Sequence, residues 1–202
     1  MQEQKKASTN AIRLSIHTTN KTTLSGDLAS NDTPFIFTTN RGDNSNSVVK
    51  INGNNAVFDG FTVRGANSFT GSIFINNANA TLKNCRVIDN GNDGLTIVGN
   101  NSTITNCSIL GNNGSGIEIS NSSPTIKKCL VANNGIGLEI YVDNATQQTT
   151  ITNSTIASNG DYGIAVFTCG SHAHQTDIKT IIHNNQVRNR YWQWQCQQYY
   201  HK

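Results

Sequence analysis

The residues of this sequence best suited to chemistry are four carboxylates, Asp93, Glu118, Glu139 and Asp161, which recur near the same point of successive segments. If Glu118 and Glu139 lie in register on adjacent strands, they are neighbours about 5 Å apart. Two carboxylates that close either raise the pKa of one of them or share a cation such as Ca²⁺. The two aspartates, each in the turn before its strand, are placed to join them. The alternative interpretation is a pair of solvated glutamates on a polar strand face, with no metal and no cofactor.

A second candidate contact surface is the segment YVDNATQQ (141–148), which enlarges one turn of the sequence pattern. Protruding turns are where repeated structures commonly meet their ligands. Tyr141, Asp143 and Asn144 are therefore candidates for contacting a polysaccharide or another glycan.

The cationic residues that a polysaccharide lyase requires are not grouped with these carboxylates. Cleavage by β-elimination needs a base, usually Lys or Arg, aimed at the proton beside a uronate whose charge is neutralised. Lys83 and Lys127 are expected to face outward from one strand position and Arg86 from another, so the three do not converge. The paired aspartates and the Gly-His-Gly of polygalacturonases are missing as well. The pattern favours a surface that binds without catalysis.

The elements that must position these residues are repeats of about 22 to 25 residues. Hydrophobic positions recur in consistent columns, for example the column of Ile51, Ile75, Ile97, Ile119 and Ile140. Within a unit, alternation indicates three short strands, which in the third unit are 95–98, 103–105 and 107–109. The units span 48–71, 72–94, 95–116, 117–137 and 138–163, and a sixth begins at Ile164.

Two polar columns mark the bends of each unit. Asn84, Asn106 and Asn153 share one column with Gly60 and Lys128. Because Gly and Asn tolerate a positive φ, this column predicts a tight left-handed corner between two strands, and Lys128 is its exception. A second Asn column lies in the longer turn, where stacked amides can hydrogen-bond along the ladder. Its members are Asn90, Asn112, Asn134 and Asn159.

Cysteines follow the left-handed corner in three units, at Cys85, Cys107 and Cys129. Stacked side chains there would have parallel Cβ vectors, which is poor geometry for a disulfide bond. A metal site would need converging ligands, and no His lies in register with the cysteines. We therefore expect a row of small inward side chains.

These repeats predict an all-β fold, a right-handed single-stranded parallel β-helix of about five or six coils. One coil hides about five apolar side chains, too few to offset the entropy lost in ordering about 22 residues, so the coils must stack. A leucine-rich repeat is the rival solenoid, but its L-x-x-L-x-L framework is absent. A coordinate set in which the three cysteines do not form one row would contradict the prediction.

The repeat divides the chain into three parts. Residues 48–167 form the regular β-helix, and residues 1–47 form irregular coils or a cap, in which 11–16 and 34–38 are candidate strands. Residues 168–202 comprise a degenerate last coil, in which DIKTIIHNN (177–185) resembles TIKKCLVANN (125–134), and a poorly ordered tail from 186. The alternative for that tail is a cap over the open edge of the sheet.

Composition and charge exclude several classes of partner. The formal net charge is +3, and neither end carries the long basic run of a nucleic-acid-binding arm. No apolar stretch approaches the roughly 20 residues that span a bilayer. The first 20 residues also lack the apolar segment of a secretory signal. We expect a monomer that does not bind nucleic acid and has no membrane span in this chain.

The segments TTLSGDLASNDTP (22–34) and NSVVKINGNNAVFDGFTVRGANS (46–68), followed by N-C-x-I/V-x-x-N units, resemble bacterial right-handed β-helix surface proteins. These include relatives of the polymorphic outer-membrane proteins within the pectate-lyase-like superfamily. The resemblance covers roughly residues 22–167 and implies an extracellular or cell-surface location. Both ends look clipped by comparison.

The leading interpretation is a non-catalytic β-helix module of a surface or secreted protein, serving as a stalk or as a carbohydrate-contacting surface. One alternative is a polysaccharide lyase or related carbohydrate-active enzyme that uses Glu118 and Glu139 with a bound cation. The other is a truncated fragment without independent function.

Overall fold

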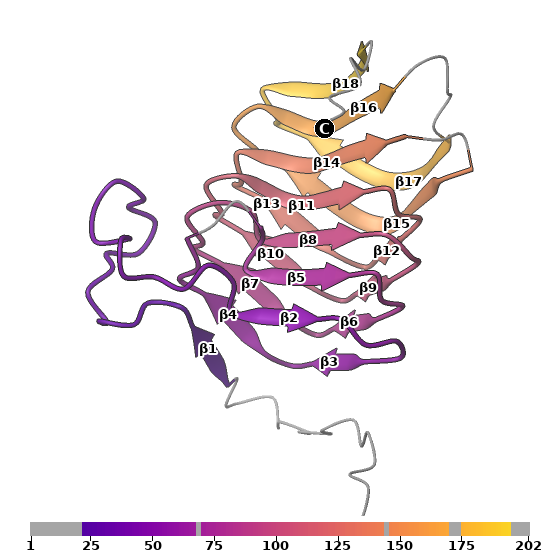
Figure 1. Ribbon diagram of the computed structural model, residues 1–202. Helices are drawn as coiled ribbons and strands as arrows, with labels where there is room; N and C mark the ends of the chain where they lie inside the picture. Colours follow the sequence, from indigo (N-terminus) through magenta and orange to yellow (C-terminus); the bar gives the residue numbers. More distant parts are fainter. Residues whose placement is uncertain (1–21, 68–69, 144–145, 170–174, 195–202) are drawn as a thin grey trace, which may run out of the picture.

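The computed structural model describes residues 22–67, 70–143, 146–169 and 175–194. The chain winds into a solenoid whose coils stack from β2 and β3 at one end to β17 and β18 at the other (Figure 1). One side is a seven-stranded parallel sheet of β2 (Val49–Ile51), β5 (Ile73–Asn76), β8 (Leu95–Val98), β11 (Ser115–Ser120), β14 (Ile136–Val142), β16 (Tyr162–Cys169) and β18 (Val187–Trp194).

The remaining strands form an eleven-stranded sheet with two limbs joined by the long strand β15 (Gln148–Ala157). We call the limb that follows the seven-stranded sheet in each coil the first limb; it contains β3 (Val57–Asp59), β6 (Thr81–Lys83), β9 (Thr103–Thr105) and β12 (Thr125–Lys127). The second limb contains β1 (Thr23–Ser25), β4 (Thr62–Arg64), β7 (Arg86–Ile88), β10 (Ser108–Leu110) and β13 (Leu130–Ala132). Strand β17 (Gln175–His183) pairs with both halves of β15.

Identical columns of the sequence repeat lie directly over one another. One column of the seven-stranded sheet consists of consecutive register partners that are all isoleucines, namely Ile51, Ile75, Ile97, Ile119 and Ile140. The last four of them are fully buried. The first limb stacks Phe58 and Leu82 with three isoleucines in the same way. Branched aliphatic side chains in register exclude water along the axis and bury apolar surface in every coil. The all-β parallel solenoid of about five coils is thereby confirmed.

The tight corner between the two limbs has the left-handed backbone that its residues predict. Asn84, Asn106 and Asn153 have φ of 55°, 53° and 50°, and Gly60 has φ of 84°. Lys128 adopts the same conformation, with φ of 54°. Residues other than Gly and Asn are strained in this conformation by roughly 1–2 kcal/mol. Asn106 donates to Asn84 Oδ1 at 2.7 Å, so the outer corner carries a short amide ladder.

Cys85, Cys107 and Cys129 lie in one row just inside this corner, buried and without a disulfide partner. The residues that follow them, Arg86, Ser108 and Leu130, are register partners in successive coils. Strand β10 begins at Ser108, one residue later than the pattern predicts and two residues after the left-handed Asn106.

A buried ladder of asparagine amides runs along the opposite, longer turn. The side-chain amide of each member donates to Oδ1 of the next, at 2.8, 2.9, 3.2 and 2.8 Å, through Asn90, Asn112, Asn134, Asn159 and Asn185. Each Oδ1 also accepts the backbone N–H of the member before it, for example Asn112 N to Asn134 Oδ1 at 3.0 Å. The ladder satisfies backbone groups that the turn would otherwise bury without partners.

The ladder explains the closing glycines of three units, Gly94, Gly116 and Gly137, each of which lies against a ladder amide. A Cβ on Gly116 would lie 2.7 Å from both Asn134 Nδ2 and Val131 Cγ1, closer than atoms can pack. Only glycine leaves room for the amide at this point of the turn.

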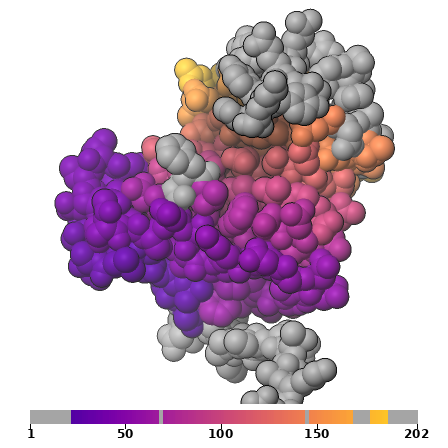
Figure 2. All heavy atoms as spheres, viewed as in Figure 1, coloured from indigo at the N-terminus to yellow at the C-terminus, as the bar shows by residue number. Residues whose placement is uncertain are grey.

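Residues 26–47 form a lobe beside the second limb, and it stands out from the solenoid in Figure 2. Buried Asp89 anchors it: its carboxylate pairs with Arg41 and Arg64, each at 2.7 Å, and accepts the N–H of Phe35 at 2.8 Å. The expected strand at 34–38 is wrong, because Phe35 turns the chain with φ of 61°, which an extended strand cannot contain. The candidate strand at 11–16 lies outside the described residues.

The end of the chain departs from its expected course. Residues from 186 were expected to leave the repeat as a tail, yet Val187–Trp194 pairs in parallel with β16 as β18. The exposed edge of β16 supplies the unpaired N–H and C=O groups that make this favourable, and the pairing covers that edge. Residues 195–202 lie outside the described residues. Across the described part of the chain, no helix is long and apolar enough to cross a membrane.

We predict that Asn112→Ala lowers the free energy of unfolding by about 2–4 kcal/mol, because it leaves the buried backbone N–H of Asn90 without an acceptor and removes one of the two bonds of the Asn90 side-chain amide. Urea denaturation followed by circular dichroism measures the loss. The control is Asn113→Ala, whose exposed side chain makes one bond to the carbonyl of Gly91. Equal losses in the two variants would contradict the importance of the ladder.

We also predict that Lys128→Asn stabilises the protein by about 0.5–1 kcal/mol, because asparagine tolerates the positive φ that lysine does not. Thermal unfolding checks the shift. Lys127→Asn removes the same charge from the neighbouring strand residue and serves as the control. A Lys128→Asn variant no more stable than Lys127→Asn would show that the corner is not strained.

Candidate functional site

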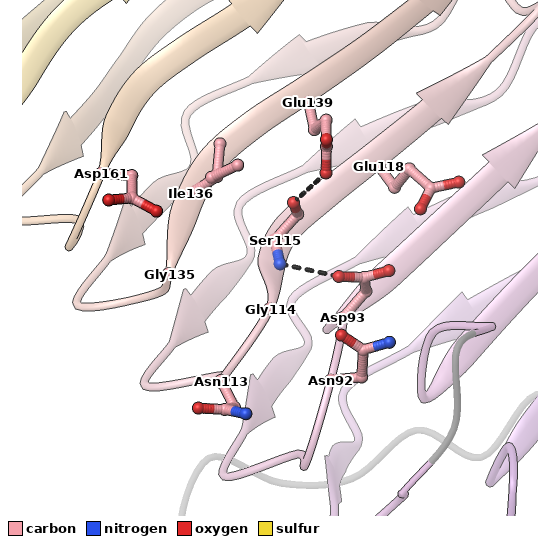
Figure 3. A pocket seen from close by; sticks show the side chains of 10 residues that line it. All are labelled: Asn92, Asp93, Asn113, Gly114, Ser115, Glu118, Gly135, Ile136, Glu139 and Asp161. Carbon is pink, nitrogen blue, oxygen red and sulfur yellow. Dashed lines mark hydrogen bonds between the residues drawn. The ribbon is translucent and has the colours of Figure 1, made fainter.

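The four carboxylates singled out in the sequence line one shallow pocket on the outer side of the seven-stranded sheet, at the start of its strands (Figure 3). Register places Glu118 of β11 directly beside Glu139 of β14, with Thr96 and Ala165 as the next members of that column. The pocket has a volume of about 330 Å³ and is lined by Asn92, Asp93, Asn113, Gly114, Ser115, Glu118, Gly135, Ile136, Glu139 and Asp161.

Hydrogen bonds hold two of the carboxylates in place. Asp93 Oδ1 accepts the N–H of Ser115 at 2.7 Å, and the hydroxyl of Ser115 donates to Glu139 Oε2 at 2.6 Å. The hydroxyl of Tyr141 donates to the other oxygen of Glu139 at 2.6 Å. These bonds cross from coil to coil, so stacking determines the orientation of both acids.

The surroundings of Glu118 favour the protonated form of its carboxyl group. Burial, followed by repulsion from Asp93 and a hydrogen bond with it, raises the pKa of Glu118 to about 8. Burial also raises the pKa of Asp93, although the Ser115 N–H opposes that shift. Glu118 is therefore mainly protonated at neutral pH and presents a hydroxyl among carboxylate oxygens.

The carboxylates share the pocket without converging on one point. Asp161 is exposed at the rim, across Gly135 and Ile136 from the other acids (Figure 3). Of the residues that the structure describes, no group of three or more His, Cys, Asp or Glu is arranged to hold a metal ion. A Ca²⁺ ion at this pocket stays a prediction, and it would require the acids to rearrange.

The candidate turn is split between the pocket and the far end of the strand. Tyr141 joins the pocket through Glu139 and stacks on Phe167, with ring centroids 5.0 Å apart and an interplanar angle of 17°. Burial and the bond to Glu139 raise the pKa of Tyr141, so it remains a donor. Asp143 instead bonds Asn121 in the coil below. Asn144 lies outside the described residues.

Two contributors were missed in the sequence, Ser115 and Phe167. Ser115 occupies the position before the closing glycine, where the neighbouring unit has Asp93. Phe167 is the register partner of Tyr141 on β16. Strand register was the signal for both, since residues of one column must stack.

The cationic residues remain away from the pocket. Lys83 and Lys127 belong to the first limb and Arg86 to the second, and none of the three lines the pocket. The described part of the pocket therefore contains no lysine or arginine that could act as the base of an elimination.

In-register coils, a dry aliphatic interior and a polar pocket on the outer sheet define a parallel β-solenoid of the β-helix class. A family model described as "Right handed beta helix region" matches residues 28–187. The chain belongs to this right-handed β-helix family, as the repeats predict. Comparisons with curated proteins and with solved structures found no match.

We predict that stability falls as pH rises through the window between the ordinary Glu pKa and about 8, because the folded state holds the Glu118 proton that the unfolded state has released. Glu118→Gln should lessen this fall between pH 5 and pH 9 by ~1–2 kcal/mol, a value reduced for solvent screening at an open pocket. Urea midpoints at pH 5, 7 and 9 measure it. Asp161→Asn, at the exposed rim, should leave the slope unchanged; an unchanged slope in Glu118→Gln would refute the assignment.

Proposed function

We propose that this chain is a non-catalytic β-helix module that binds a neutral or amino-bearing glycan through the pocket and the adjoining Tyr141–Phe167 pair. The proposal depends on one observation: carboxylate oxygens that are held in place by hydrogen bonds lie next to an accessible aromatic ring. Tyr141 is 38% exposed and connects the two parts through its bond to Glu139.

The polar part of the pocket is suited to sugar hydroxyl groups. Asp93 and Glu139 are held by Ser115, and Glu118 supplies a hydroxyl donor at neutral pH. Acceptors and donors that are oriented before binding lose little entropy when a ligand arrives. A pocket of this size takes one or two sugar rings and leaves the rest of a chain along the sheet.

The aromatic part is suited to the apolar face of a sugar ring. Aromatic rings supply large, rigid contact area with a polar edge, and Tyr141 is held by both Phe167 and Glu139. An unsubstituted C–H face of a pyranose packs on such a ring without desolvating its hydroxyl groups.

Charge selects the class of glycan. Asp93, Glu139 and Asp161 surround the pocket, and no cation among its lining residues offsets them. A uronate would be repelled there, whereas a neutral sugar or an ammonium-bearing amino sugar would not. Such ligands are met at a cell surface or outside a cell, in agreement with the location that the family resemblance implies.

A second candidate function is a carbohydrate-active enzyme in which Glu118 donates a proton. The raised pKa of Glu118 beside the other acids favours it, because glycoside hydrolysis uses two carboxyl groups whose pKa values differ. The bonds that Glu139 accepts from Ser115 and Tyr141 argue against it, since they stabilise its charged form and so make it a weaker base or nucleophile.

The binding proposal is tested on immobilised neutral oligosaccharides and chitosan oligomers. We expect Tyr141→Ala to weaken retention about five- to tenfold, by removing the aromatic contact. The control is Leu130→Ala, which truncates an equally exposed apolar side chain on the second limb. Binding of none of these glycans, or equal effects of the two substitutions, would overturn the proposal.

Catalysis is tested in two assays. Hydrolysis is measured by incubating the same oligosaccharides with the protein and counting new reducing ends. Elimination is measured by incubating uronate polymers with the protein and Ca²⁺ and recording the absorbance of unsaturated products. The binding proposal expects no product and expects Glu118→Gln to retain binding. Product formation that Glu118→Gln abolishes, and that declines above pH 8, would establish the enzyme instead.

A further inference from the structure

The repeat places an asparagine directly before a glycine in several of its turns. These pairs are Asn52–Gly53, Asn90–Gly91, Asn113–Gly114, Asn134–Gly135 and Asn159–Gly160. The backbone nitrogen of the second residue can attack the side-chain carbonyl carbon of the asparagine, and glycine has no Cβ to hinder that attack. Each pair is therefore a candidate for spontaneous deamidation, a reaction that makes asparagine a thermolabile residue.

The reaction needs only water and a base, and it involves no change of oxidation state. The glycine nitrogen loses its proton and bonds to Cγ, the Cγ–Nδ2 bond breaks, and ammonia leaves a five-membered succinimide ring. Water then opens the ring to aspartate or isoaspartate. The attack requires a glycine N–H that is not held by an acceptor and an asparagine side chain that can rotate onto the backbone, so the fold controls the rate through local opening.

Three of the pairs contain members of the buried ladder, and hydrogen bonds hold both of their reacting groups. The side-chain oxygen and nitrogen of Asn90, Asn134 and Asn159 are all bonded. The glycine N–H groups donate to backbone carbonyls at 2.7, 2.8 and 2.8 Å, from Gly91 to Ala66, from Gly135 to Gly114 and from Gly160 to Asn134. Attack in these pairs requires the turn to open.

The pair at the pocket is held less firmly. Asn113 is exposed, and its amide donates to the carbonyl of Gly91 at 3.2 Å. The N–H of Gly114 donates to the carbonyl of Asn92 at 3.1 Å. One surface bond and one backbone bond must therefore break before this pair can react.

The pair Asn52–Gly53 lies at the end of the stack, where β2 is the terminal strand of the seven-stranded sheet (Figure 1). In the coils above, the backbone N–H two residues after the isoleucine column donates to the next coil, at 2.8, 3.0 and 3.0 Å, from Asn77, Gly99 and Asn121. Within the described part of the chain, the equivalent N–H of Gly53 makes no such bond, and the amide of Asn52 has no partner.

The surroundings of this pair are open to solvent. Asn52 and Gly53 are both exposed, and a Cβ added to Gly53 would meet no atom within 4 Å. The turn is tied to the coil above through Asn54 and Asn55, which bond Asn79 at 2.8 and 2.9 Å. The side chain of Asn52 therefore has room to rotate onto the backbone, and water can reach the ring that forms.

We propose that Asn52 is the deamidation site of the folded protein and that stacking protects the ladder asparagines, which have the same sequence context. The product places a carboxylate near the exposed Lys50 of β2. Its isoaspartate form also adds one methylene to the backbone of the turn that Asn54 and Asn55 tie to Asn79. The modification thus acts on the attachment of the first coil, and it does not depend on the glycan pocket.

The test incubates the whole chain in buffer at pH 6 and at pH 8 and measures the conversion of each asparagine to acid by peptide mass analysis. We expect Asn52 to react at least about tenfold faster than the three ladder asparagines, with Asn113 between them, because the ladder pairs react only after local opening. The reaction should be faster at pH 8, since the glycine nitrogen must lose its proton. In concentrated urea the five asparagines should react at similar rates.

The variant is Gly53→Ala, which places a methyl group beside the attacking nitrogen and should slow the conversion of Asn52 about tenfold. The space around Gly53 accepts this methyl group without a clash, so thermal unfolding should show the variant folded. The control is Gly42→Ala, a glycine of the lobe with equally open surroundings that follows Arg41 instead of an asparagine. It should leave the conversion of Asn52 unchanged.

Three results would each overturn the proposal. They are ladder asparagines that react as fast as Asn52 in the folded chain, an Asn52 that reacts in urea but not in the folded chain at pH 8, and equal rates for Asn52 in the two alanine variants.

Discussion

Hydrogen bonding between stacked coils is the interaction on which the rest of this structure depends. A single coil has three short strands and a few apolar side chains, and each strand inside the stack has its N–H and C=O partners in the coils above and below. The buried ladder from Asn90 to Asn185 extends the same pairing into a turn, where the backbone alone could not supply it. The coils are consequently stable only together, and the spacing along the axis is that of a parallel sheet.

That fixed spacing turns a sequence column into a surface. Inside the solenoid it produces continuous rows of isoleucine and a row of three cysteines. Outside, it brings Glu118 against Glu139 on one sheet and places Lys127 in line with Thr105 and Thr152 on another.

The two outer surfaces differ in how they gain order. The acids of the pocket are oriented by bonds between coils, and burial makes one of them a proton donor at neutral pH. The outward column of Lys83, Thr105, Lys127 and Thr152 gains its order from strand register alone. A pocket of that kind suits a few specific contacts with its ligand.

Much of the architecture was readable from the sequence, because a side chain in a solenoid sees the same environment once per coil. The isoleucine columns, the left-handed corners at Asn84 and Asn106, and the neighbourhood of Glu118 and Glu139 all follow from periodicity. Only the tertiary structure decided features that have no repeat. The pairing of 187–194 with β16, the turn at Phe35 and the ion pairs of Asp89 depend on which edge or buried charge lies nearby in space. Likewise the protonation of Glu118 and the bond from Ser115 to Glu139 arise from burial and from distances between coils, quantities that spacing along the chain does not contain.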